Sequence, residues 1–212
     1  MSVPWIYRLA LIALLFVYLI GSRIILGRRE KHHQLLESTL FNLLLVVLYN
    51  ALCYLAMIIP PDPTVISQPP LLDKVLMRQW YSALGQVLCL GSIGMLLYTV
   101  SRRRAIGGQD TKGKLLTKGI YSFSRHPIYL GIVLISLGLA IMRLNFDALL
   151  VFPLVFLANF IQARLEEKYD MEVRFPDDYA GYKEQTKMFA PFWFWGLLII
   201  LLVAPIGIFL ME

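Results

Sequence analysis

Charged residues are scarce in this sequence. Asp, Glu, Lys and Arg make up 16% of its 212 residues, whereas about 25% is usual in a soluble domain. Hydrophobic residues account for 58%, which exceeds the typical share of about 45–50%. A soluble domain of this length needs fewer apolar residues to form a core, so the excess indicates a protein that resides in lipid.

Cysteine is also rare, and this excludes two kinds of site. The two cysteines, Cys53 and Cys89, lie inside apolar stretches. Their spacing fits neither a metal motif nor a disulfide framework, so we predict small apolar packing residues and no metal site. The net charge of +6 does not indicate nucleic-acid binding, because no compact basic domain carries it. Basic cytoplasmic loops are its usual source in a membrane protein.

Long apolar segments are abundant. A helix needs about 20 apolar residues to cross a bilayer. We therefore predict an all-α, polytopic membrane protein with about six transmembrane helices, whose first segment is a retained span and not a signal peptide. The fourth and fifth segments would form a hairpin turned at residues 143–147. The six segments are 3–26, 39–59, 82–100, 127–142, 146–162 and 191–210, and the third holds glycines that would allow close helix contact, namely Gly85, Gly91 and Gly94.

The basic residues alternate between connections, which predicts the topology. Lys and Arg number three in residues 27–38, seven in 101–126 and five in 163–190, but two in 60–81. Because basic loops face the cytoplasm, the first, third and fifth connections are predicted to be cytoplasmic and both termini to lie outside it. With the compact layout, this favours a prokaryotic inner membrane and an active site that faces the cytoplasm.

Residues 113–131 are the first segment that could carry chemistry. Pro127 fits the first turn of a helix, which makes His126 the residue that caps it. Backbone N–H groups and the helix dipole favour an anion there, and the Arg125 guanidinium could clamp a carboxylate or phosphate. An interfacial anchor, with Tyr129 in an aromatic belt, is an equally good interpretation of the spacing alone.

Residues 163–191 are the second such segment. Glu166 and Glu167 directly follow an apolar span, where ionisable groups are costly and usually functional or paired. A solvated helix start with local basic partners is the alternative interpretation. Tyr179 and Tyr182 are three residues apart and share a helix face, where packing is their simplest role.

Taken in order, these segments resemble the isoprenylcysteine carboxyl methyltransferase family and its phospholipid methyltransferase relatives. The resemblance covers about residues 113–191, whereas residues 1–100 match only as generic spans. One departure is Lys187-Met188, where the family often has an Arg shortly before the final Phe-x-Pro. The motifs are Gly119-Ile120-Tyr121, the Arg-His-Pro-x-Tyr-x-Gly string Arg125 to Gly131, Glu166-Glu167, Phe175 to Tyr182 and Phe189-Ala190-Pro191.

The resemblance implies transfer of a methyl group from S-adenosylmethionine to a hydrophobic, membrane-resident acceptor. The acceptor could be a prenylcysteine carboxylate, a phospholipid amine, a thiol or another lipid that arrives from the bilayer. Arg125 and Glu167 are the predicted catalytic residues, in a cytosolic pocket formed by the C-terminal half. The predicted cofactor-binding residues are Tyr121, Arg125, His126, Pro127, Tyr129, Gly131, Glu166, Glu167, Tyr179 and Tyr182.

The resemblance also divides the chain. Three N-terminal transmembrane helices occupy residues 1–100, a methyltransferase-like core 101–191 and an additional transmembrane helix 192–212. Two other function classes stay open at this point. One is a membrane reductase similar to sterol reductases, which would use NADPH. The other is a non-enzymatic assembly or transport protein, although the spans hold few of the charges that a transporter often needs.

Overall fold

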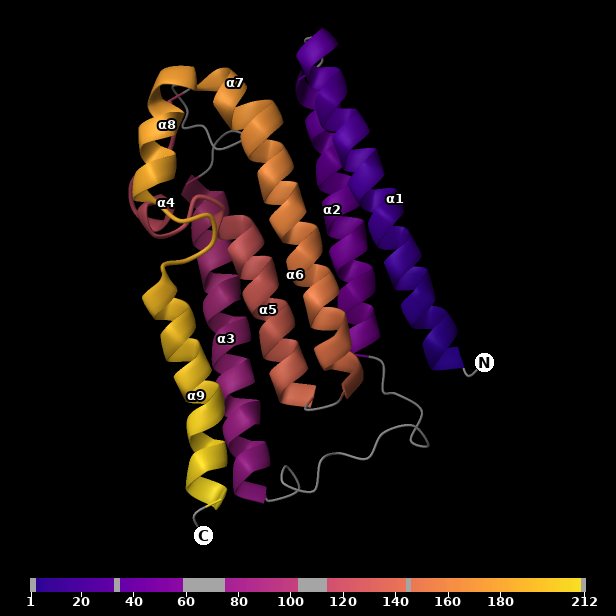
Figure 1. The fold of residues 1–212 in the computed structure, drawn as a ribbon, viewed down its shortest axis with the longest axis vertical. Helices are drawn as coiled ribbons and strands as arrows, with labels where there is room; N and C mark the ends of the chain where they lie inside the picture. The colour runs from indigo at the N-terminus through magenta and orange to yellow at the C-terminus, as the bar shows by residue number, and fades with distance from the viewer. Residues whose placement is uncertain (1–2, 33–34, 59–74, 103–113, 144–145, 211–212) are drawn as a thin grey trace.

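The computed structural model describes residues 3–32, 35–58, 75–102, 114–143 and 146–210. These residues are mainly helical (Figure 1), which confirms the all-α prediction, and all six predicted long helices are present. The elements are α1 (Val3–His32), α2 (Leu35–Ile58), α3 (Val75–Arg102), α4 (Ile120–Phe123), α5 (Pro127–Arg143), α6 (Phe146–Glu166), the π-helix η2 (Glu167–Met171), α7 (Glu172–Arg174), α8 (Pro176–Gln185) and α9 (Phe192–Leu210).

The long helices form a bundle with a small cap at one end. Helices α1, α2, α3, α5, α6 and α9 make up the bundle, and α4, η2, α7 and α8 make up the cap (Figure 1). The C-terminal ends of α1, α3 and α6 point toward the cap, and both chain termini lie at the opposite end (Figure 1). The helix ends beside the three basic connections therefore share one end of the molecule.

Within the described residues, one helix is both long and apolar enough to cross a membrane, Met77–Ser101 in α3. Four others carry shorter apolar stretches. Six membrane crossings therefore stay a prediction. The shorter apolar stretches are Leu9–Ile25, Leu44–Met57, Pro127–Met142 and Phe192–Ala204.

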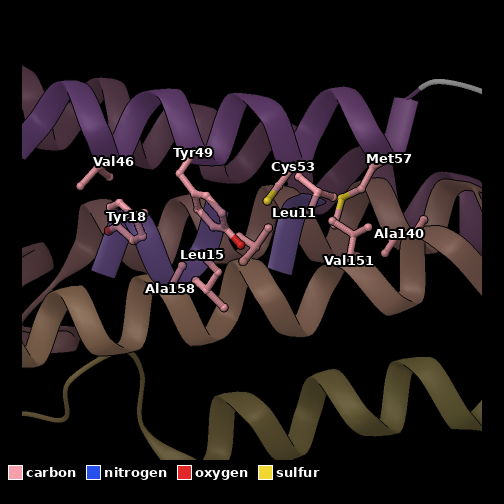
Figure 2. Packing of buried hydrophobic residues seen from close by; sticks show 12 residues of the cluster. Leu11, Leu15, Tyr18, Val46, Tyr49, Cys53, Met57, Ala140, Val151 and Ala158 are labelled. Carbon is pink, nitrogen blue, oxygen red and sulfur yellow. The ribbon is translucent and has the colours of Figure 1, made fainter. Parts of the chain in front are cut away.

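Helices α1, α2 and α6, with Ala140 of α5, share one core, shown in Figure 2. Tyr18 of α1 stacks on Tyr49 of α2, with ring centroids 5.0 Å apart. Cys53 is fully buried in the same cluster, in the packing role that the sequence predicted. The other apolar members of this core are Leu11, Leu15, Val46, Met57, Ala140, Ala148, Val151, Val155 and Ala158.

Helices α3 and α5 meet through glycines. A Cβ atom on Gly85 would lie 2.6 Å from the carbonyl oxygen of Gly138, and one on Gly138 would lie 2.7 Å from the carbonyl oxygen of Gly85. The two backbones can be this close only because neither residue has a side chain. The predicted close contact is confirmed for Gly85 and wrong for Gly91 and Gly94, where an added Cβ would have no described atom within 4 Å.

Helix α9 packs against the start of α3. The Tyr81 hydroxyl donates a hydrogen bond to the carbonyl of Leu202 at 2.8 Å, and Leu198 joins the core formed by α5 and α9. At the cap end of α9, Phe192 is 80% exposed and Trp193 is 64% exposed. Exposed aromatic side chains at a helix end are typical of a membrane interface.

Candidate functional site

Arg125 lies at the centre of the cap, just before α5. Its Nε atom donates to an oxygen of Glu167 at 2.9 Å, and its Nη2 atom forms an ion pair with the same oxygen at 2.8 Å. Its Nη1 atom donates to the carbonyls of Lys183, at 2.9 Å, and of Thr186. A guanidinium has five N–H donors, and these contacts occupy most of them. The anion that Arg125 clamps is therefore Glu167 of the protein itself.

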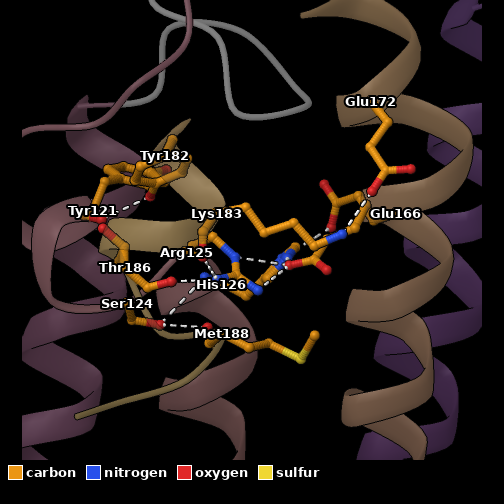
Figure 3. Close-up of polar contacts among 11 residues, drawn as sticks. Tyr121, Ser124, Arg125, His126, Glu166, Glu172, Tyr182, Lys183, Thr186 and Met188 are labelled. Atoms are coloured by element: carbon orange, nitrogen blue, oxygen red, sulfur yellow. Dashed lines mark hydrogen bonds and ion pairs between the residues drawn. The ribbon is translucent and has the colours of Figure 1, made fainter. Parts of the chain in front are cut away.

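Two backbone hydrogen bonds fix this segment to the chain that follows α8. The N–H of Arg125 donates to the carbonyl of Lys187 at 3.0 Å, and that of His126 to the carbonyl of Met188 at 3.1 Å. The Ser124 hydroxyl also donates to Met188, at 3.0 Å (Figure 3). The orientation of Arg125 and His126 is thus set by residues about 60 positions further along the chain.

His126 lies between two carboxylates. Its Nε2 atom is 3.2 Å from Glu167 and its Nδ1 atom 3.7 Å from Glu166, while its ring stacks on Tyr129 with centroids 5.6 Å apart. Burial disfavours the charged imidazole, but the hydrogen bonds that it donates to Glu166 and Glu167, together with their negative charges, outweigh burial. Together they raise the pKa of His126 above its ordinary value of 6.5.

Glu167 is the buried anion of the site, with 2% of its side chain exposed. Burial alone would raise its pKa, but His126 and Arg125 outweigh burial and lower the pKa from 4.5 to about 2. Glu167 begins η2, and the π-helical turn brings Glu167, Asp170 and Met171 all to the buried side. Such turns are frequent at functional sites. The alternative interpretation, a solvated Glu167, is therefore wrong.

Two buried oxygens beside this cluster lack a hydrogen bond to any described residue. They are Oε2 of Glu167 and the hydroxyl of Tyr179. Burial raises the pKa of Tyr179 most, and the nearby carboxylate of Glu167 raises it further, so its phenol is a neutral donor that lies near Glu167 and Arg125. A buried donor and acceptor without a partner are each costly, and a bound ligand would satisfy both.

An aromatic wall completes the site. The Tyr182 hydroxyl donates to the carbonyl of Tyr121 at 2.7 Å, and the rings of Tyr179 and Tyr182 meet edge to face, 6.2 Å apart. The predicted shared helix face of Tyr179 and Tyr182 is confirmed, since both are buried on α8. The cavity inside holds about 10 Å³ and is lined by Leu115, Leu116, Tyr121, Arg125, His126, Met171, Tyr179 and Tyr182.

The structure brings most predicted site residues together and separates one. Pro127 is the first residue of α5, as predicted, and Glu166 lies beside His126. Gly131 instead faces α3, where an added Cβ would lie 2.8 Å from the side chain of Leu96. Gly131 therefore serves helix packing. Arg125 is 8% exposed, so it does not have the exposed side chain of a simple interfacial anchor.

Sequence reasoning missed the residues whose carbonyls hold Arg125 and His126 in place, namely Lys183, Thr186, Lys187 and Met188. Every residue type has a carbonyl, so no side-chain pattern marks these positions. The departure at Lys187-Met188 leaves these backbone contacts intact. The Lys187 side chain itself points away and lies over the ring of Phe192, with Nζ 5.6 Å from its centroid.

Comparisons with known proteins converge on one chemistry. Residues 80–177 match the phospholipid methyltransferase family. The protein-S-isoprenylcysteine O-methyltransferase of Schizosaccharomyces pombe is 34% identical over 110 residues, which are 50% of this chain and 46% of that protein. The enzyme of the same name from Saccharomyces cerevisiae is 38% identical over 79 residues, 37% of this chain and 33% of that protein.

These matches confirm the predicted resemblance, and the matched region includes both Arg125 and Glu167. The chain spans less than half the length of the two curated relatives. No solved structure gives a significant match.

Proposed function

We propose, from the match of residues 80–177 to the phospholipid methyltransferase family, that this protein transfers a methyl group from S-adenosylmethionine to a hydrophobic acceptor in the membrane. The observation that carries the proposal is the buried cluster of Arg125, His126 and Glu167. Two sequence motifs about 40 residues apart form it, and both belong to the matched region.

The chemistry of the cavity residues fits S-adenosylmethionine. This cofactor supplies a methyl group that its sulfonium has already activated. Oε2 of Glu167 is a buried acceptor without a partner among the described residues, suited to an amine or a ribose hydroxyl. The neutral hydroxyl of Tyr179 is a donor, and the faces of Tyr121 and Tyr182 suit a cation or a purine ring.

The present cavity is far smaller than such a cofactor. Its volume of about 10 Å³ holds roughly one water molecule. Leu115 and Leu116, which precede α4, form an apolar wall of the cavity. Binding of S-adenosylmethionine requires the cavity to widen, and we expect Leu115 and Leu116 to move away from α8 when it does.

The acid–base properties of the site favour an acceptor that is already nucleophilic. A general base works best with a pKa near the operating pH. Glu167 has a pKa of about 2, which makes it a weak base, and the raised pKa of His126 favours its protonated form. A carboxylate needs no proton removed before it attacks the methyl carbon, whereas an ammonium does. The site therefore favours a lipid-linked carboxylate over a phospholipid amine.

The surface of the bundle supports a membrane location. Large apolar side chains are exposed along several helices, among them Val17 at 65%, Leu90 at 70% and Ile200 at 62%. Soluble proteins rarely expose apolar patches this extensive. With six crossings of an inner membrane, the cap would face the cytoplasm and the acceptor would enter from the bilayer beside it. Residues 101–191 would form the catalytic core, and the helices of 1–100 and 192–212 would surround it.

Calorimetry on the purified full chain tests the proposal. S-adenosylmethionine and its demethylated product are each expected to bind with micromolar affinity, and NADPH is expected not to bind. The Glu167→Gln variant should lose this binding. The matched Glu172→Gln variant should keep it, because Glu172 is exposed and its ion pair among the described residues is with Lys183. Absence of heat with either ligand in the folded protein would refute the proposal, and binding of NADPH alone would indicate a reductase.

Methyl transfer is measured next, with labelled S-adenosylmethionine and two acceptors in the same vesicles. One acceptor is a prenylated cysteine with a free carboxylate, and the other is a phospholipid with a primary amine. Label is expected in the carboxylate as a base-labile ester. Label in the amine alone would contradict the preference derived from the pKa values of Glu167 and His126.

A further inference from the structure

A second cavity lies between α1 and the end of α6, and we call it the α1–α6 groove. Its volume is about 440 Å³, within the range of about 300–1,000 Å³ that is usual for ligand pockets. It shares no lining residue with the cavity beside Arg125. Its lining consists of four apolar side chains, Leu19, Ile20, Ile161 and Leu165, with Arg23, Lys168 and Tyr169.

The polar and apolar parts of the groove are separated along the helix axes. Arg23 lies near the end of the apolar stretch Leu9–Ile25 of α1, and Lys168 follows α6 within η2. Both helices run toward the cap at this point (Figure 1). The apolar lining residues of α1 and α6 precede the two cations in sequence, so they lie deeper in the bundle. A ligand that fits this arrangement has a charged head at the cap end and an apolar chain.

The two cations are available to a ligand. Arg23 and Lys168 are both exposed, and neither forms an ion pair with a carboxylate of the described residues. Lys168 instead lies over the ring of Tyr169, with Nζ 5.3 Å from its centroid. By contrast, Arg125, Arg174 and Lys183 in the cap each pair with a carboxylate. The head of the ligand is therefore expected to be an anion.

We propose that the α1–α6 groove binds one anionic phospholipid. Its phosphate would lie between Arg23 and Lys168, and an acyl chain would follow the apolar lining of α1 and α6. Basic pockets between transmembrane helices on the cytoplasmic side bind lipid headgroups of this kind, and each cation strengthens the affinity roughly fivefold. Because Lys168 directly follows Glu167 in η2, the bound lipid would brace the helical turn that carries the buried carboxylate. This site rests on the proposed membrane location, but its test requires no methyl transfer.

Native mass spectrometry of the full chain in detergent tests the proposal. The protein is titrated with phosphatidylglycerol and, separately, with phosphatidylcholine of the same chain length, without S-adenosylmethionine. Wild-type protein should retain one phosphatidylglycerol at least tenfold more tightly than phosphatidylcholine. The double variant Arg23→Gln/Lys168→Gln should bind phosphatidylglycerol roughly 25-fold more weakly than wild type. Ile20→Trp, which fills the groove and keeps both cations, should also weaken binding.

Arg164→Gln is the matched control, since Arg164 is exposed on the same helix, one turn before Lys168, and does not line the groove. It should change lipid affinity less than twofold. Circular dichroism checks that every variant stays helical. Equal affinity of the wild type for the two lipids, or an unchanged double variant, would overturn the proposal. Full displacement of the lipid by inorganic phosphate, with no effect of Ile20→Trp, would also overturn it, because the groove would then be a bare anion site.

Discussion

The cap and the bundle of this protein both bury polar side chains, but the kinds of group differ. In the cap, the buried groups carry charge, and Arg125 bonds to Glu167 at 2.8 Å. In the bundle, the buried groups are neutral. The Tyr18 hydroxyl donates to the Gln162 amide oxygen at 3.1 Å, and the Asn159 amide donates to Asn50 at 2.9 Å.

The difference follows from the cost of removing charge from water. A buried ion loses several kcal/mol of solvation, and only close partners offset that loss. The cap supplies such partners because loops and helix ends there offer free carbonyls, such as those of Lys183 and Thr186. Carbonyls in the middle of a bundle helix are already bonded within the helix. The cap can therefore hold a charged site, whereas the bundle is limited to neutral pairs.

The largest expected effect is on the buried ion pair of the cap. Arg125→Met removes one of the two cations beside the buried Glu167 carboxylate and leaves only His126, so the free energy of unfolding should fall by up to about 3–5 kcal/mol. Chemical denaturation in detergent micelles measures this loss. The double variant Arg125→Met/Glu167→Leu should recover most of the stability, because replacing both ions by apolar groups is often nearly neutral.

The same double variant separates stability from function. It should still fail to bind S-adenosylmethionine, since both predicted catalytic residues are gone. If the double variant is as unstable as Arg125→Met, the stability does not depend on compensating the buried charge of Glu167. The contrast between a charged cap and a neutral bundle would then be wrong. If it binds the cofactor normally, the site lies elsewhere.

The next effect is on the pH dependence of stability, which the cap alone should show. The pKa of Glu167 falls from 4.5 to about 2 on folding, so its contribution is full above pH 4.5 and is lost as the pH falls toward 2. The loss amounts to about 3 kcal/mol. The pKa of His126 is raised above 6.5, so its contribution is full below pH 6.5 and is lost as the pH rises through the folded-state pKa.

The protein should therefore be most stable between pH 4.5 and pH 6.5. Denaturation midpoints measured across this range test the prediction. Glu167→Gln should remove the acid limb of the profile, and His126→Gln should remove the neutral-to-alkaline limb. A profile that both variants leave unchanged would show that other groups control the pH dependence.

The sequence predicted the bundle better than the cap. Long apolar runs identify helices directly, and all six were found, with α5 and α9 within one residue of the predicted bounds. The helix start at Pro127 was also predictable, because proline fits that position. By contrast, Glu166 and Glu167 looked equivalent in the sequence. The π-helical turn at Glu167 separates them, and no local pattern predicts that turn.

The partners of Arg125 were unpredictable for a different reason. Its side chain binds backbone carbonyls of Lys183 and Thr186, and carbonyl positions depend on tertiary structure alone. The same limit applies to Gly131, which lies in the family motif but packs against Leu96 of α3. Motif membership thus identified the region of the site, while individual roles depended on contacts between distant segments.

A smaller effect is expected at the glycine contact of the bundle. A Cβ on Gly85 would lie 2.3 Å from the Met142 side chain and 2.6 Å from the carbonyl oxygen of Gly138. Gly85→Ala must therefore separate α3 from α5, and overpacking of this kind typically destabilises by about 1–3 kcal/mol. Gly91→Ala is the control. An added Cβ there meets open space, so the helix should gain up to about 1 kcal/mol. Equal midpoints for the two variants in denaturation would contradict the close contact.

The smallest effect is expected for the neutral pair of Asn50 and Asn159. A double-mutant cycle with Asn50→Leu and Asn159→Leu measures their coupling, which should be about 0.6 kcal/mol and at most about 1.7 kcal/mol. The coupling is small because the Asn159 amide also donates to the Val155 carbonyl at 2.8 Å, and Asn50 donates to Val46 at 2.8 Å. Each asparagine therefore keeps a hydrogen-bond partner when the other is removed. The charge of Glu167, by contrast, has no such reserve partner once Arg125 and His126 are removed. A coupling of about 3 kcal/mol or more would be as large as the loss from breaking a buried ion pair. It would mean that neutral pairs in the bundle contribute as much to stability as the charged pair in the cap.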